Sequence, residues 1–194
     1  MPEIKKTTLA TPRLTLRWME QDDLDALYAI YGDPKVTRYW SSGAWTEMQQ
    51  AEESLAHTLA GYEDGKYLRF AVAPNDGGPM IGTVSLYQFY PQNRRCELGY
   101  AFGSAHWGRG FAVEAVEAAI AYAFRELDIN RIEADIDPRN GPSGRVLERV
   151  GFRKEGYMPE RWIVNGEAAD TVYYGLLKRY WDERPAPFVS HGDR

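Results

Sequence analysis

The residues best placed to do chemistry form a short glycine-containing turn, Trp107-Gly108-Arg109-Gly110-Phe111, directly before a long predicted helix. Glycine lets the backbone approach a ligand closely, and the first amides of a helix lack internal partners and point beyond its end. The helix dipole adds partial positive charge at the same place. The turn therefore predicts a phosphate or pyrophosphate site, to which Arg109 adds a cation. A tight turn with Gly-Phe packing explains the glycines alone equally well.

Two other phosphate-binding motifs fit this turn poorly. In the dinucleotide-binding pattern Gly108 and Gly110 match, but Val113 stands at the third glycine position, and the preceding strand belongs to an antiparallel meander. A nicotinamide-dependent oxidoreductase is therefore a weak alternative. The P-loop is excluded because its Gly-Lys-Ser/Thr element is missing.

The elements that must position this turn follow from hydrophobic periodicity and turn residues. We expect helices at residues 21–31, 46–62 with Thr46 as N-cap, 110–127 and 141–150. We expect strands at residues 14–17, 67–73, 80–90, 95–102, 131–136, 154–164 and 169–177. This order indicates an α/β fold with a mixed sheet. Residues 1–184 are predicted to form a single domain, and the proline-containing residues 185–194 a loose tail.

Bulk composition excludes several classes of protein. The 194 residues carry a net charge of −5 without a strongly basic run, which argues against nucleic acid as a ligand and mildly favours amines as partners. The single cysteine excludes an internal disulfide, and three scattered histidines make no zinc signature. Neither an apolar signal region nor a membrane-length apolar run is present. We therefore expect a cytoplasmic protein with no metal and no membrane partner.

Several short motifs, taken in order and spacing, resemble the GCN5-related N-acetyltransferases (GNAT), and within them the RimJ/RimL branch, which acetylates protein N-termini and assorted small amines. The resemblance runs from Thr11 to about Trp181. Its markers are Thr11-Pro12-Arg13-Leu14, Glu97-Leu98-Gly99-Tyr100, Trp107-Gly108-Arg109-Gly110-Phe111-Ala112-Val113-Glu114-Ala115, and Asn140 with Ser143, Leu147, Gly151 and Phe152.

The resemblance implies acetyl-coenzyme A as co-substrate and a mostly antiparallel sheet of about seven strands with about four helices. Its fourth and fifth strands, around residues 95–102 and 131–137, would splay apart at a bulge and admit the pantetheine arm. The bulged strand would offer an amide to the thioester carbonyl. The cofactor-binding backbone would be that of Gly108, Arg109, Gly110, Phe111, Ala112 and Val113.

The implied reaction is direct attack of a neutral amine on the thioester in a ternary complex. The resemblance makes Glu97 the first candidate base, directly or through water; otherwise it is a structural carboxylate paired with Arg94, Arg95 or a backbone amide. Glu160, in a segment expected to line the acceptor site, is the second candidate, or else a solvated charge. The acceptor stays open between a protein N-terminus and a small-molecule amine.

By the same resemblance, Ser143 would hydrogen-bond or protonate the coenzyme A sulfur, and Asn140 would contact the pantetheine chain. The alternatives are a helix N-cap for Ser143 and a loop-capping role for Asn140. Gly144 replaces the family's bulky apolar residue, so we expect a wider acyl or pantetheine channel. This leaves the identity of the acyl group open.

Aromatic residues near the implied acceptor site are candidate walls or plain core: Trp40, Trp45, Tyr87, Phe89 and Tyr90. Cys96 is expected to be buried packing rather than an acyl carrier. A non-catalytic acyl-coenzyme A sensor is the main alternative to an enzyme, and the intact Asn140/Ser143 pair favours the enzyme. Dimers are common in the enzymes that the chain resembles, so a homodimer stays open.

Overall fold

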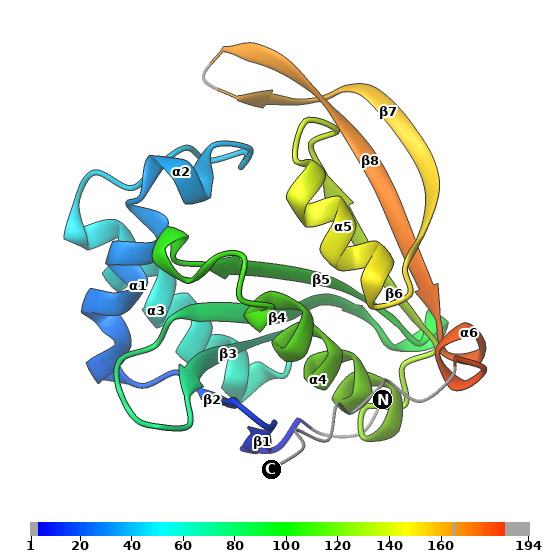
Figure 1. Ribbon diagram of the computed structural model, residues 1–194, viewed down its shortest axis with the longest axis horizontal. Helices are drawn as coiled ribbons and strands as arrows, with labels where there is room; N and C mark the ends of the chain where they lie inside the picture. Colours follow the sequence, from blue (N-terminus) through cyan, green and yellow to red (C-terminus); the bar gives the residue numbers. More distant parts are fainter. Residues whose placement is uncertain (1–3, 165, 185–194) are drawn as a thin grey trace.

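The computed structural model describes residues 4–164 and 166–184, which form an eight-stranded sheet with helices on both faces (Figure 1). The strands are β1 (Leu9–Ala10), β2 (Leu14–Trp18), β3 (Tyr67–Pro74), β4 (Gly82–Tyr90), β5 (Arg95–Phe102), β6 (Arg131–Ile136), β7 (Arg153–Val164) and β8 (Glu167–Leu177). The helices are α1 (Leu24–Tyr31), α2 (Pro34–Thr37), α3 (Met48–Asp64), α4 (Phe111–Arg125), α5 (Gly141–Arg149) and α6 (Lys178–Asp182), with single 3-10 turns at Gln21–Asp23, Pro91–Asn93 and Ser104–His106.

The strands lie in the order β1-β2-β3-β4-β5-β6-β8-β7. Between the described strands every pairing is antiparallel except that of β5 with β6. The expectation of a mixed, mostly antiparallel α/β sheet is therefore confirmed. The two-residue strand β1 and the short helices α2 and α6 are additional to the predicted elements.

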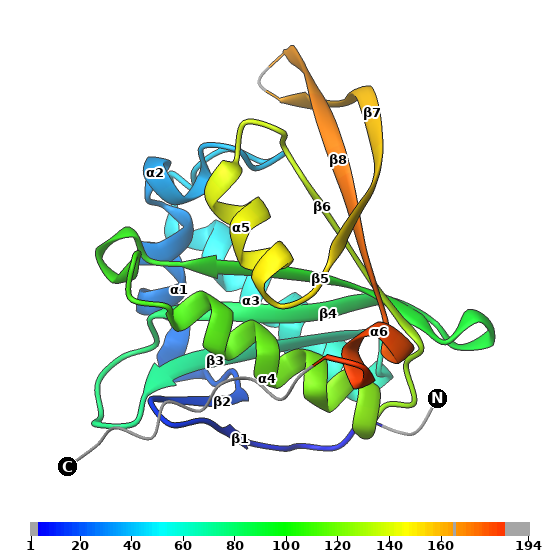
Figure 2. The same cartoon turned by 45° about the vertical axis from the view of Figure 1, so that its right-hand side comes forward.

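Alternation along the strands sorts their side chains onto the two faces of the sheet. Phe70 and Leu98 belong to the core under α4, whereas Ala71 and Ala101 pack with residues of α1 and α3. Figure 2 shows α4 and α5 on one side of the sheet and α1 and α3 on the other. Consequently, odd-numbered residues of β5 face α1 and α3, and even-numbered ones face α4 and α5.

The start of α3 differs from the expectation of Thr46 as its N-cap. Glu47 is the N-cap, and it forms a reciprocal capping box with Gln50. The Gln50 side chain also accepts the Thr46 N–H at 2.8 Å. The Glu–Gln pair satisfies amides at both ends of the first turn, which explains why the helix starts after Thr46.

The predicted separation of the strands around residues 95–102 and 131–137 is confirmed. β5 and β6 pair only over residues 95–97 and 131–133, after which β6 pairs with β8 alone. The bulge, however, is on β4, where Gln88 and Phe89 together face Cys96 of β5. Gln88 has a positive φ of 51°. A bulge increases local twist, and this one lies beside the rung where β5 leaves β6.

The β7–β8 hairpin extends past the body of the molecule as an arm (Figures 1 and 2). It forms one side of the space that opens between β5 and β6. The predicted loose tail, residues 185–194, lies outside the described residues. None of the described helices has the length and apolar character that a membrane span requires.

Candidate functional site

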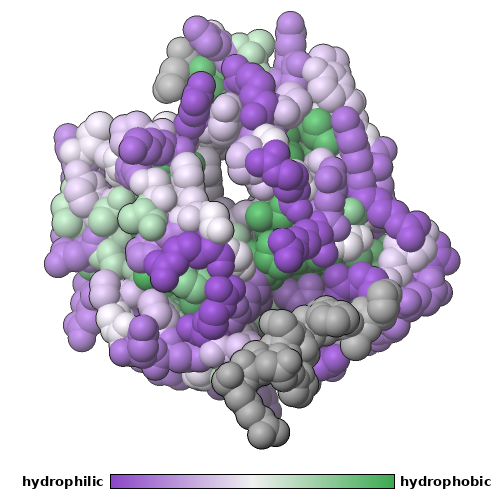
Figure 3. Space-filling model, in the orientation of Figure 1, coloured by the Kyte–Doolittle hydropathy of each residue, from purple (hydrophilic) through white to green (hydrophobic). Residues whose placement is uncertain are grey.

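A cavity of about 340 Å³ lies where β5 and β6 separate. Its walls come from β4, β5 and β6, from the start of α5, from the segment after α2, and from the β7–β8 arm. The space-filling view shows the surface hollowed in this region, between α2 and α5 (Figure 3). The gap passes between the two strands, so the cavity can be reached from both faces of the sheet.

The charged side chains that line this cavity are all carboxylates: Glu97, Asp135, Asp137 and Asp170. Among the described lining residues there is no lysine, arginine or histidine. One of the four charges is balanced locally, because Asp137 pairs with Arg139 at 2.6 Å. A cavity with an excess of negative charge attracts cations, among them a protonated amine.

Glu97 lies on β5 at the last rung that β5 shares with β6. Its predicted alternative partners are both engaged elsewhere, Arg94 with Asp128 and Arg95 with Glu133. Within the described residues the Glu97 carboxylate receives no hydrogen bond. Burial, and then the charges of Asp135 and Glu133, raise its pKa above the ordinary glutamate value, with Arg95 and Arg161 opposing. An unpaired carboxylate of raised pKa is suited to accept a proton.

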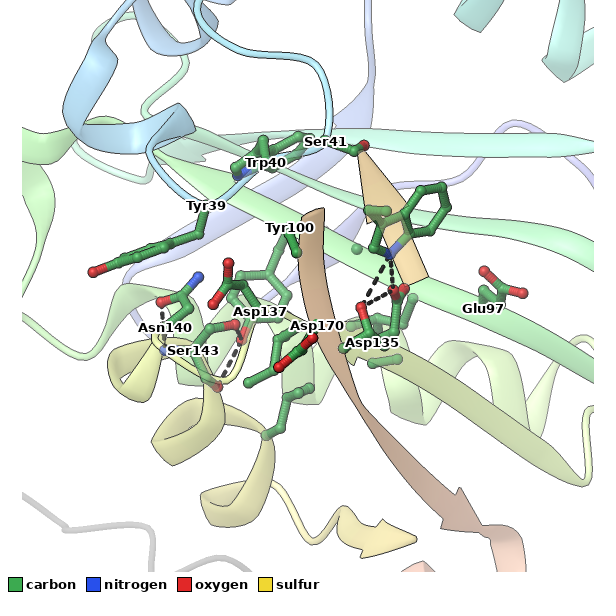
Figure 4. A pocket seen from close by; sticks show the side chains of 18 of the residues that line it. Tyr39, Trp40, Ser41, Glu97, Tyr100, Asp135, Asp137, Asn140, Ser143 and Asp170 are labelled. Atoms are coloured by element: carbon green, nitrogen blue, oxygen red, sulfur yellow. Dashed lines mark hydrogen bonds between the residues drawn. The ribbon is translucent and has the colours of Figure 1, made fainter. Parts of the chain in front are cut away.

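Ser143 lies in the first turn of α5, on the opposite side of the close-up view from Glu97 (Figure 4). The N-cap is Asn140, whose side chain accepts the Ser143 N–H at 3.3 Å. The N-cap alternative for Ser143 is therefore wrong, and Asn140 caps the helix α5 rather than a loop. Because the Asn140 side chain caps the helix, the Ser143 hydroxyl is free to contact Tyr100, whose hydroxyl oxygen is 2.7 Å from Ser143 Oγ.

Tyr100 is a site residue that the sequence interpretation treated only as a family marker. Its hydroxyl also donates to the Ser143 carbonyl oxygen at 3.0 Å. Burial raises its pKa, although the hydrogen bond with Ser143 opposes this shift. Tyr100 therefore remains protonated at neutral pH. When its single proton is directed to Ser143 Oγ rather than to the carbonyl, the Ser143 hydroxyl proton is free to be donated to another acceptor. Alternation along β5 places the Tyr100–Ser143 pair and Glu97 on opposite faces of the sheet, with the gap between them.

Tyr100→Phe should lower kcat about tenfold, because one hydrogen bond of about 1–1.5 kcal/mol is lost. The loss stays modest because a thiol of pKa about 8.5 leaves without full protonation. Tyr174→Phe is the matched control, since the Tyr174 hydroxyl binds Glu148 on the far side of α5. Steady-state rates of thiol release measure both variants. Equal rates for Tyr100→Phe and wild type would remove Tyr100 from the reaction.

The glycine turn has a backbone conformation that glycine adopts more readily than other residues. Gly108 and Gly110 have positive φ angles of 74° and 78°, and Gly110 is the N-cap of α4. No side chain caps this helix, so its first amides point outward without a side-chain acceptor. Open space faces Gly108. These features fit a pyrophosphate held by the backbone of residues 108–113, and that assignment stays a prediction.

The family marker Thr11-Pro12-Arg13 has a structural role, because its residues hold the glycine turn in place. We call Thr11, Arg13 and Glu114 together the clamp. Glu114, in the first turn of α4, accepts hydrogen bonds from the Thr11 hydroxyl at 2.6 Å and from the Arg13 backbone and side chain at 2.9 and 2.6 Å. Arg13 also donates to the Arg109 carbonyl at 2.8 Å. Burial alone would raise the pKa of Glu114, but these hydrogen bonds lower it. The clamp joins the start of β2 to the turn and fixes the turn's position.

Glu160 is not brought to the other candidates. It lies at the register break of β7 with a positive φ of 51° and an exposed side chain, and it does not line the cavity. Its backbone N–H donates to Asp170 at 2.8 Å. The position on the arm agrees with the alternative of a solvated charge.

The structure adds a polar group on the acceptor side that the sequence interpretation missed. The Trp162 indole N–H lies 3.3 Å from an Asp135 oxygen and 3.0 Å from the Thr171 hydroxyl, which orients Asp135 in the cavity (Figure 4). Alternation along β6 was the available signal, because Glu133 and Asp135 occupy one face while Ile132 and Ala134 occupy the other.

The predicted aromatic walls divide into two groups. Trp40 and Tyr87 line the cavity, whereas Trp45 stacks on Tyr31 in the core. Phe89 and Tyr90 are not lining residues; they follow the lining residue Gln88 on β4, within the bulge and just beyond it. Burial raises the pKa of the Cys96 thiol, as expected for buried packing.

Gly144 does not widen the channel, contrary to expectation. A Cβ atom at this position would lie 3.1 Å from the Tyr174 hydroxyl and 3.5 Å from Ile136. Gly144 lines a separate hollow between α5 and β8 and is absent from the lining of the main cavity. The glycine therefore allows α5 to pack closely against β8.

Comparisons with known proteins agree with one another. The family model described as acetyltransferase (GNAT) domain matches residues 13–153. The N-acetyltransferase p20 of Bacillus licheniformis is 38% identical over 89% of this chain and 97% of its own. The ribosomal protein uS5-alanine N-acetyltransferase of Escherichia coli is 29% identical over 92% of this chain and 94% of its own. A GNAT-family acetyltransferase structure from Bacillus anthracis superposes with a TM-score of 0.80 at 26% identity, covering 89% of this chain and 99% of that one.

Proposed function

Because this chain belongs to the GNAT family and is an acetyl-coenzyme A-dependent N-acetyltransferase, we propose that its acceptor is the α-amine of a protein N-terminus and that Glu97 is its general base. The observation that carries the proposal is the acidic cavity in the gap between β5 and β6, with an unpaired carboxylate on one face and a hydroxyl pair on the other. The alanine N-acetyltransferase of Escherichia coli, similar over most of both chains, acts on such an amine.

In this proposal the co-substrate lies across the α4 side of the sheet. The backbone of residues 108–113 holds the pyrophosphate, helped by Arg109, and the clamp of Arg13 and Glu114 keeps the turn in place. The pantetheine arm enters the gap where β5 has lost β6 as a partner. Successive amides of a strand point to opposite edges, so every second amide of β5 beyond Glu97 faces the gap and can donate to the thioester carbonyl oxygen.

Glu97 takes the proton that the amine must lose before it attacks. An α-amine has a pKa of about 7.7–8.0, against about 10.4 for a lysine side chain. The difference corresponds to about 3.5 kcal/mol of deprotonation cost at neutral pH, so an α-amine needs less help from the base. The raised pKa of Glu97 reduces the pKa difference between the amine, which gives up the proton, and the carboxylate, which accepts it. On the other face, Ser143 and Tyr100 supply a proton to the departing thiolate.

The choice of acceptor is tested with three substrates and mass spectrometry. These are a peptide with a free N-terminal alanine and no lysine, the same peptide with a blocked N-terminus and an internal lysine, and a small diamine. We expect the first to be acetylated at least about tenfold faster than the others, given the pKa difference. Faster acetylation of the diamine would assign a small-molecule amine instead, and faster acetylation of the lysine would assign a side-chain amine.

A further inference from the structure

Glu133 lies on β6 directly across from Glu97, at the last paired rung of β5 and β6. Both side chains are on the sheet face toward α1 and α3, by the alternation of each strand. Arg95 is on the same face of β5, two residues from Glu97, and pairs in register with Arg131. Arg95 therefore has two carboxylates within reach, one on its own strand and one on the neighbouring strand.

The structure pairs Arg95 with Glu133. Their side chains are 2.5 Å apart, and the Arg95 guanidinium lies 3.9 Å from the centre of the Tyr90 ring. The other Glu133 oxygen accepts from Arg131 at 2.7 Å. Glu133 thus uses both carboxylate oxygens on two arginines, and Glu97 is left outside this network.

The network continues across β8 and balances its own charge. Arg131 also binds Glu155 of β7 at 2.5 Å. A Cβ atom on Gly175 of β8 would lie 2.5 Å from a Glu155 oxygen, so the pair needs a glycine beneath it. Two arginines and two glutamates therefore form a chain of ion pairs without net charge, which spans β5, β6 and the arm: Arg95, Glu133, Arg131 and Glu155. The members on β5 and β6 are about three-quarters buried, where ion pairs are screened less than at the surface.

We propose that Glu133 is a positioning residue that holds Arg95 and Arg131 and so keeps the Glu97 carboxylate out of an ion pair. The inference rests on the proposed function only where it treats Glu97 as the base. The remaining groups around Glu97 are Asp135 on β6, Arg161 on β7 and Tyr87 on β4, and its carboxylate binds none of them within the described residues.

Removing Glu133 changes the surroundings of Glu97 in two ways that act in the same direction. The negative charge that opposes ionisation of Glu97 disappears. Arg95, freed from its partner, can turn to Glu97 two residues away on the same face. Loss of a like charge and gain of an opposite charge both favour the carboxylate. Glu133→Gln should therefore make Glu97 a weaker, ion-paired base.

The test is a carboxyl-carbon NMR titration of the full-length protein labelled at glutamate, with the Glu97 signal assigned by its absence in Glu97→Gln. In Glu133→Gln we expect the Glu97 midpoint to fall by about 1 pH unit relative to wild type. Glu155→Gln is the matched control, because it removes only the outer partner of Arg131, and the midpoint should stay in place. Glu133→Asp should restore much of the wild-type midpoint.

A second variant separates positioning from folding. In Arg95→Met/Glu133→Gln the freed cation is absent, so the midpoint should return toward that of wild type. Both charges of the pair are removed together, so neither is left buried without a partner. An unchanged midpoint in folded Glu133→Gln, or an equal fall in the double variant, would overturn the proposal. The titration needs no turnover. A fall in the midpoint together with full activity of Glu97→Gln would therefore reject the base role alone.

Discussion

Glu97→Gln is expected to slow acetyl transfer to a lysine-type amine by about 10²–10⁴-fold, the usual contribution of a positioned base. The effect on an α-amine should be smaller, about tenfold, because near pH 8 roughly half of such amines are already neutral. Glutamine keeps the size of the side chain and cannot take the proton. Single-turnover rates with both acceptors, at saturating acetyl-coenzyme A, measure the difference.

The same substitution should stabilise the protein, and the sign follows from the raised pKa of Glu97. Because the pKa of Glu97 is raised in the folded protein, the folded protein binds a proton there more tightly than the unfolded chain does. The contribution of this proton binding to the stability of the fold is fully present below the ordinary glutamate pKa. It is lost as the pH rises through the raised pKa of the folded protein. Glu97→Gln removes that loss, so its thermal midpoint should exceed that of wild type at neutral pH. The two midpoints should converge below about pH 4.

Glu160→Gln is the control for both effects, since the Glu160 side chain is exposed and does not line the cavity. It should leave the rates and the thermal midpoint as they are in wild type. If Glu97→Gln and Glu160→Gln behave alike with both acceptors, Glu97 is not the base. A selective loss in Glu160→Gln would place the base on the β7–β8 arm instead.

Gly110→Glu is expected to weaken acetyl-coenzyme A binding by at least about 100-fold, or about 2.7 kcal/mol. Gly110 has a φ of 78°, which other residues adopt only with strain. A Cβ atom there would lie 3.4 Å from the Arg13 guanidinium. The added carboxylate would stand at the helix N-terminus, where the proposed pyrophosphate lies, and would repel it. Calorimetric titration with acetyl-coenzyme A measures the change.

Gly77→Glu is the control, because it introduces the same charge at another glycine of positive φ and changes only the position in the fold. Gly77 also has a positive φ, 92°, and a Cβ atom added there would have nothing within 4 Å. It belongs to the turn between β3 and β4, distant in sequence from α4. This variant should bind acetyl-coenzyme A as wild type does. Wild-type affinity in folded Gly110→Glu would show that the glycine turn does not hold the pyrophosphate.

The fold was largely readable from the sequence because its signals are local. Alternation from residue 131 to 136 and the apolar stripe of the long helix both predict elements that the structure contains. The strand separation was implied by resemblance. The bulge was assigned to the wrong strand, because it depends on how two strands align and not on the composition of either.

The site was only partly readable, because its decisive features are choices between partners. Arg95 stands two residues from Glu97, and spacing alone allows them to pair; only the arrangement of β5 against β6 shows that Glu133 takes Arg95. The contact of Trp162 with Asp135 joins residues 27 positions apart. The contact of Tyr100 with Ser143 spans 43 positions. Such contacts leave no periodic signal in a single sequence.

The most direct test of this mechanism is a crystal structure of the complex with coenzyme A and a peptide with a free N-terminus. We predict that the pyrophosphate lies on the amides of residues 108–113 and that the sulfur lies between β5 and β6, beside Ser143 and Tyr100. We also predict that the peptide amine lies within about 2.6–3.2 Å of Glu97, or one water away. A sulfur outside the gap, or an amine held by Asp135 beyond the reach of Glu97, would contradict the mechanism.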